Sequence, residues 1–139
     1  METAFEYKFK NKYIMKLNKE NMHVVMEGSN TKMCVQEGLG GMTAGFNVLP
    51  KGTDFTPLLK GLNNNSCHCP HWGYVIEGAM KVIYDDGNEE VISTGDVYYL
   101  PAGHTAIVQD DIKLVDFNPA HEFKEVMDHV GKKMAEMGG

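Results

Sequence analysis

Short apolar segments separated by turn-forming residues run through most of this sequence and limit the folds it can adopt. The segments cover 22–27, 31–36, 42–49, 55–62, 79–84, 89–93, 97–100, 104–109 and 112–117. Between 79–84 and 89–93 lies Asp85-Asp86-Gly87-Asn88, whose Asp-Gly pair is a strong hairpin signal. About nine or ten short strands spaced by turns predict an all-β sandwich or barrel.

The two ends of the chain have different patterns. Phe5, Tyr7 and Phe9 alternate with charged residues, which predicts a strand with one buried face or an arm that crosses onto a partner subunit. After Pro119, apolar residues that include several methionines recur every three or four positions, which predicts an amphipathic helix. We interpret this methionine stripe as packing over an open sheet edge or a neighbouring subunit. The sequence thus predicts a single domain with N-terminal strands or an arm (1–41), a barrel core (42–118) and a C-terminal helix (119–137).

Composition narrows the classes of function. The 139 residues carry 19 acidic and 13 basic side chains, a net charge of −6, which argues against nucleic-acid binding and against an anionic membrane surface. No apolar run is long enough to span a membrane, and the first residues lack a signal-peptide pattern. With an odd count of 3 cysteines, we expect free thiols in a reducing cytoplasm.

The segment Cys67-His68-Cys69-Pro70-His71 concentrates the side chains that transition metals prefer. Residues two apart on a strand share a face, so an extended segment would project Cys67, Cys69 and His71 together and His68 the other way. The alternative is an apolar strand with incidental polar residues. Tyr98 and Tyr99 also straddle one strand, so one of them should point inward.

Two segments together resemble the paired motifs of the cupin family. The first motif has the form G-x5-H-x-H-x3-E-x6-G, and His71, six residues and Gly78 match its end. The second has the form G-x5-P-x-G-x2-H-x3-N, and Gly95, five residues and Pro101-Ala102-Gly103 match its first half. The resemblance covers roughly residues 42–118 and implies a double-stranded β-helix, the jelly-roll barrel of cupins. It also implies a homodimer.

The sequence departs from the family pattern at the metal-ligand positions. Those positions hold Asn65, Cys67, His71 and Ala106, so the usual set of three histidines and one glutamate is absent. Asp110 stands where the second motif has its asparagine. His104 follows Pro101-Ala102-Gly103 and shares a strand face with position 106, which adds it to the candidates. The phrase Cys-x-Cys-Pro-His resembles a group of small bacterial and archaeal cupins.

The candidate metal ligands are therefore Cys67, Cys69, His71 and His104. Two sulfur and two nitrogen donors suit a divalent transition metal, zinc first, with iron, nickel or copper as competitors. Cys69 matches no family ligand and could instead line the pocket. Three protein ligands would leave a position open for water or substrate, whereas four would indicate a structural metal.

Two functions fit this pattern. The first is a metal-dependent protein that acts on a small polar molecule as an isomerase, lyase or hydrolase. The second is a non-catalytic module that binds or senses a small molecule, with a structural metal or with redox-active thiols. The sequence leaves open whether the protein is an enzyme.

Overall fold

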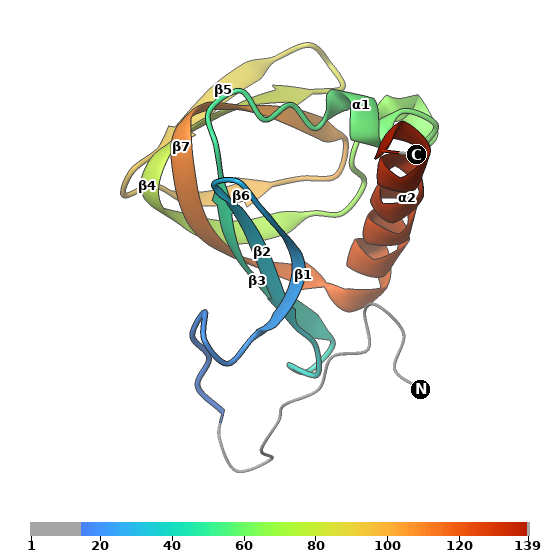
Figure 1. Cartoon of the computed structure of the whole chain (residues 1–139). Helices are drawn as coiled ribbons and strands as arrows, with labels where there is room; N and C mark the ends of the chain where they lie inside the picture. Colours follow the sequence, from blue (N-terminus) through green and yellow to red (C-terminus); the bar gives the residue numbers. More distant parts are fainter. Residues whose placement is uncertain (1–14, 139) are drawn as a thin grey trace.

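The computed structural model describes residues 15–138, so the strand or arm predicted around Phe5, Tyr7 and Phe9 lies outside it. The described chain folds as a curled antiparallel sheet with its helices on one side (Figure 1). The strands are β1 (His23–Gly28), β2 (Thr31–Gln36), β3 (Met42–Leu49), β4 (His71–Tyr84), β5 (Glu89–Ser93), β6 (Val97–Leu100) and β7 (His104–Pro119). The helices are α1 (Thr56–Leu59), the 3-10 helix η1 (Asn63–Asn65) and α2 (Ala120–Gly138).

The observed sheet and the helix α2 confirm the prediction of an all-β jelly roll with a C-terminal helix. Its strand order is β1-β2-β3-β7-β4-β5, and β6 pairs with β4. Every pairing between these strands is antiparallel. None of the helices in the described part of the chain is long and apolar enough to span a membrane.

The two longest strands, β4 and β7, include three of the shorter predicted strands. The segments 104–109 and 112–117 are both parts of β7, and 79–84 is the second half of β4. These strands pair from Trp72 opposite Phe117 to Tyr84 opposite His104, with register shifts on both sides of Gly78. Such bulges bend a strand without ending it. The turn expected near Asp110 is therefore a bend within a continuous ladder.

The strand predicted over 55–62 is wrong, because α1 lies there. The backbone N–H groups of Leu58 and Leu59 donate to the Phe55 carbonyl, and the Asp54 carboxylate accepts from the Thr56 N–H. Proline suits the first turn of a helix, where a missing N–H costs nothing. Pro57 at this position therefore favours a helix over the strand that we expected.

Helix α2 packs its apolar stripe inward. Phe123, Val126 and Val130 are buried together with Leu59 of α1 and Val35 of β2. Met127 and Met134, which belong to the predicted methionine stripe, line a cavity inside the curl of the sheet. The first three turns of the stripe therefore face the interior of the domain, whereas Met137 near its end is 63% exposed.

Apolar side chains also gather on the outer surface of β4, β6 and β7, here called the aromatic face. Trp72 and Tyr99 stack with ring centroids 5.2 Å apart, and Tyr74 lies opposite Val97. Val97 is 83% exposed. The members of the aromatic face are Trp72, Tyr74, Ile76, Val97, Tyr99 and Phe117.

Gly78 should be the most sensitive glycine of the barrel. Its φ is +102°, and a Cβ there would lie 2.2 Å from the Asp111 carbonyl oxygen on β7. Gly87 has a similar φ of +89° with open space around it. We expect Gly87→Ala to cost about 1 kcal/mol from backbone strain alone, and Gly78→Ala to cost more than about 3 kcal/mol. Equal losses in chemical denaturation would contradict a steric role for Gly78.

Candidate functional site

Cys67 is held at the entrance to β7. Asn64 and Asn65 adopt positive φ angles of 57° and 53°, which turn the chain out of η1 toward Cys67. The Cys67 N–H donates to the His104 carbonyl at 2.7 Å, and the Gly103 N–H donates to the Cys67 carbonyl at 2.8 Å. This short bridge fixes the backbone of Cys67 against that of His104.

His71 is the first residue of β4, and its ring is oriented by a hydrogen bond. The Nδ1–H donates to the side-chain oxygen of Asn118, near the end of β7. The Nε2 atom then keeps its lone pair and lies 3.5 Å from the Cys67 Sγ. One imidazole nitrogen is thus held by the protein while the other faces the thiol.

His104 is oriented in the same way. Its Nδ1–H donates to the Pro101 carbonyl at 2.8 Å, which leaves Nε2 free. The rings of His71 and His104 lie edge to face with centroids 4.9 Å apart. One ligand atom from each of Cys67, His71 and His104 lies within 4.8 Å of the others. The structure therefore brings together three of the four predicted ligands.

Cys69 is placed differently from the sequence expectation. Pro70 has no N–H for a ladder, and β4 begins only at His71, so Cys67, Cys69 and His71 do not share one strand face. The Cys69 side chain is fully buried, its Sγ donates to the Pro70 carbonyl at 3.3 Å, and it stands outside the three-residue group. His68 points elsewhere, with its Nε2 2.7 Å from the Asn63 carbonyl oxygen.

Burial keeps the three grouped side chains uncharged. Burial and the neighbouring His71 lower the pKa of His104 to about 4, and burial lowers the pKa of His71 despite its bond to Asn118. Burial raises the pKa of the Cys67 thiol to about 11. A protonated, buried thiol is a poor nucleophile, so the structure gives little support to a thiol-based sensor.

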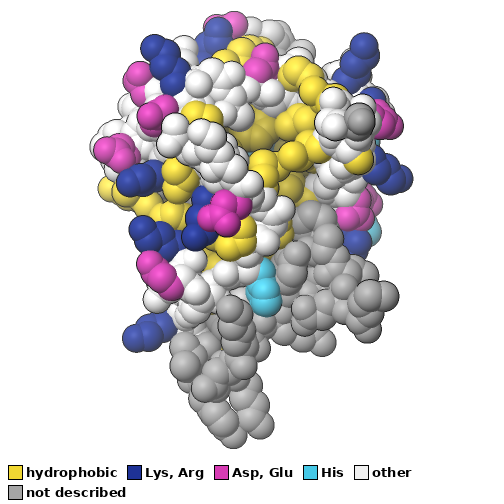
Figure 2. Space-filling view, viewed as in Figure 1, with side chains coloured by type: hydrophobic (Ala, Val, Ile, Leu, Met, Phe, Trp, Pro, Cys, Tyr) yellow, Lys and Arg dark blue, Asp and Glu magenta, His cyan; other side chains and the backbone are white. Residues whose placement is uncertain are grey.

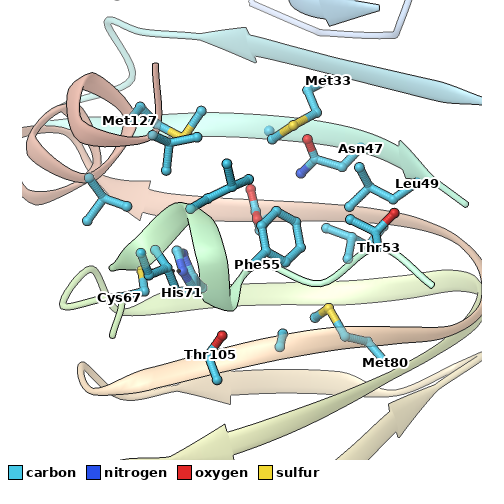
Figure 3. Close-up of a pocket in the computed structure, with 18 of the residues that line it drawn as sticks. Met33, Asn47, Leu49, Thr53, Phe55, Cys67, His71, Met80, Thr105 and Met127 are labelled. Atoms are coloured by element: carbon cyan, nitrogen blue, oxygen red, sulfur yellow. Dashed lines mark hydrogen bonds between the residues drawn. The ribbon is translucent and has the colours of Figure 1, made fainter. Parts of the chain in front are cut away.

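The group lies at the wall of a cavity of about 320 Å³. Most of the lining is apolar, including five methionines (Met26, Met33, Met80, Met127 and Met134). Figure 2 shows hydrophobic side chains around a hollow on the face of the molecule that Figure 1 also presents. In the close-up of Figure 3, Cys67 and His71 lie side by side at one end, apart from Met33, Asn47 and Leu49.

Sequence reasoning missed polar residues around this cavity. The Asn118 amide connects His71 to Asp116, because its Nδ2 donates to the Asp116 Oδ1 at 3.0 Å. Burial raises the pKa of Asp116 to about 6. Strand alternation carried the signal: Asp116 and Asn118 continue the inward parity of Ile112 and Leu114. Tyr98 is the inward member of its pair, whereas Tyr99 is 54% exposed.

The sequence matches no protein-family model and no curated protein, but solved structures share its architecture. An RmlC-like cupin from Shewanella frigidimarina is 20% identical, with a TM-score of 0.54 over 76% of this chain and 91% of that one. This chain has the cupin fold. The same fold is seen in the Clostridium difficile EutQ protein, which is 17% identical with a TM-score of 0.52 over 71% of this chain and 69% of that one.

A third structural relative is the FeII form of HppE, with a TM-score of 0.53. It is 8% identical, and the match covers 78% of this chain and 62% of that one. Identities this low establish the common fold only. The residues of the site, and not the relatives, must therefore carry the functional argument.

The lowered pKa of His104 predicts a pH-dependent contribution to the stability of metal-free protein. The unfolded imidazole takes up a proton near pH 6.5, but the folded one does so only near pH 4. The contribution of the neutral His104 to the free energy of unfolding is therefore complete above pH 6.5. It is lost as the pH falls from there through 4, and the total loss is up to about 3 kcal/mol. We expect His104→Gln to lose this slope in urea unfolding.

The comparison must be made between the two proteins at each pH. Asp116 has the opposite sign, since its folded pKa of about 6 lies above the ordinary 3.8 and adds stability as the pH falls. The contribution of Asp116 cancels when the unfolding free energy of His104→Gln is subtracted from that of the wild type at the same pH. Identical pH slopes in the two proteins would contradict the buried, neutral His104.

Proposed function

We propose that this cupin binds one divalent transition metal, zinc first, through Cys67, His71 and His104, and acts on a small molecule in the adjoining cavity. The observation that carries the proposal is the common orientation of the two histidines. Both donate from Nδ1 to fixed oxygen acceptors and leave Nε2 available beside the Cys67 sulfur. Metal-binding histidines have this arrangement, with the second nitrogen donating to a carbonyl or carboxyl oxygen.

The spacing and chemistry of the side chains fit such an ion. Cys67 Sγ lies 3.5 Å from His71 Nε2, and one donor atom from each of the three side chains lies within 4.8 Å of the others, so one ion could contact all three. Two imidazoles and one thiolate suit zinc, and iron or nickel compete for such sites. The FeII form of HppE supplies a precedent for metal use within the fold.

The chain's own groups prepare the site for a cation. Both imidazoles are neutral near pH 7 because their pKa values are lowered, so neither has to lose a proton. The Cys67 thiol, whose pKa is about 11, would have to release its proton from Sγ. With three protein ligands, a bound metal supplies Lewis-acid activation of a fourth ligand, either water or substrate.

The cavity lining defines what the site accepts. The sequence suggested a small polar molecule, but the walls of the cavity are formed mainly by methionine, leucine, valine and phenylalanine side chains. Apolar walls favour a molecule with a largely apolar body. We therefore propose a substrate whose polar group is directed to the Cys67–His71–His104 end.

Metal content of variants tests the three-ligand proposal. We expect protein purified without a histidine tag to contain about one metal per chain by elemental analysis. Cys67→Ala, His71→Ala and His104→Ala should each lower this content at least tenfold. Asn118→Ala, which removes the acceptor of His71 Nδ1–H, should weaken binding about 10–100-fold in competition with a chelator.

The neighbouring residues provide matched controls. His68→Ala and Cys69→Ala should keep the wild-type metal content, because neither side chain belongs to the three-residue group. Loss of metal in Cys69→Ala would instead favour the four-ligand site predicted from the sequence. The proposed function would be ruled out if the metal content of wild-type protein stayed at the background level after reloading with Zn²⁺, Fe²⁺ or Ni²⁺.

We also propose that the expected homodimer forms through the aromatic face. Its support is a contiguous set of exposed aromatic and aliphatic side chains, the kind of patch that marks protein interfaces. Tyr74→Glu should shift the protein toward monomer in light scattering after size exclusion. Val24→Glu, at a residue of β1 that is 44% exposed, should leave the dimer intact. A monomeric wild-type protein would contradict the proposal.

A further inference from the structure

Asn47 places an unsatisfied polar atom at the cavity. It lies on the inward face of β3, is 7% exposed and lines the cavity. Its side-chain oxygen has no hydrogen-bond partner among the described residues. A buried acceptor without a donor costs free energy, so such atoms in folded proteins usually meet a ligand or an ordered water. In Figure 3 the Asn47 amide is directed into the space that Met33 and Phe55 also border.

A second acceptor stands in the same wall. Asp116 also lines the cavity, and its Oδ1 accepts a hydrogen bond from Asn118. An ionised carboxylate has acceptor sites for several donors, so the Asn118 amide uses only part of its capacity. Asp116 and Asn47 lie on neighbouring strands, opposite Gly45 and Leu114 respectively. Both therefore project from one inner surface.

Two glycines make room for this polar wall. Gly45, Asp116, Gly73 and Tyr98 lie opposite one another across four adjacent strands. A Cβ at Gly45 would lie 2.4 Å from the Asp116 Oδ1, and one at Gly73 would lie 2.4 Å from the Tyr98 hydroxyl oxygen. The absence of side chains at these positions thus provides the space that the Asp116 carboxyl and the Tyr98 ring occupy.

We propose that Asn47 and Asp116 form a donor-recognising subsite, which binds a hydroxyl or amino group of the ligand in addition to the polar group directed to the Cys67–His71–His104 end. The surrounding walls include Met33, Leu49 and Leu114, which offer no donor of their own. The subsite deepens the proposed function by naming a ligand class, and it rests on the same cavity being the binding site. It does not require a bound metal, so it can be tested without one.

Paired small probes test the subsite in chelator-treated protein. The probes are 1-hexanol, which has a donor, and 1-methoxypentane, which has the same heavy-atom count and none. We expect wild-type protein to bind 1-hexanol about tenfold more tightly in NMR titrations, since one satisfied hydrogen bond accounts for a factor of this size. Equal affinities, or no binding of either probe, would overturn the proposal and indicate a cavity where water alone satisfies Asn47.

Variants separate the subsite from the general apolarity of the cavity. Asn47→Leu keeps the size of the side chain and should abolish the preference for the alcohol, with the ether bound at least as tightly as before. Met80→Leu changes another lining residue without removing an acceptor and should retain the tenfold preference. An unchanged preference in Asn47→Leu would overturn the assignment. If that variant does not fold, Asn47→Ser should show a reduced preference.

The design distinguishes the two proposals. All affinities are measured without metal, so a protein that never retains metal can still discriminate between the probes. Conversely, a protein that binds one zinc through Cys67, His71 and His104 can fail to discriminate. The first result would contradict only the proposed metal site, and the second would contradict only the proposed subsite.

Discussion

Closure of the β4–β7 ribbon is the constraint on which the site depends. His71 begins β4 opposite the end of β7, whereas His104 begins β7 opposite the end of β4. On straight strands these positions would be roughly 40 Å apart, at about 3.3 Å per residue. Their rings are nevertheless 4.9 Å apart, because the ribbon bends around the barrel. The bulges beside Gly78, where β7 backbone passes close by, permit that bend.

The electrostatics of the site follow from the same closure. Curling the sheet removes His71, His104 and Cys67 from water, which disfavours their charged forms. The Asn118 amide orients both neighbours, since its oxygen accepts a hydrogen bond from His71 and its nitrogen donates one to Asp116. His71, Asn118 and Asp116 therefore form one hydrogen-bonded chain of side chains beside an otherwise apolar cavity.

Local patterns in the sequence predicted most of the strands but only part of the site. Alternation identified β2 and β3, and the Asp-Gly pair identified the β4–β5 hairpin, because neighbouring residues decide these features. The helix at Thr56 and the placement of Cys69 depend on proline geometry and on contacts distant in sequence, so they were missed. Asp116 and Asn118 carried a readable parity signal, but the turn expected near Asp110 divided the strand that would have revealed it.

Gly45 and Gly73 determine how deep the polar recess of the cavity is. They flank Asp116 on its two neighbouring strands, and neither contributes a side chain to the volume above it. A larger residue at Gly45 would displace the Asp116 carboxyl, whereas one at Gly73 would meet both the Tyr98 ring and the Val115 backbone carbonyl. One substitution at Gly45 would thus reshape the polar recess from the barrel wall, with every candidate metal ligand left in place.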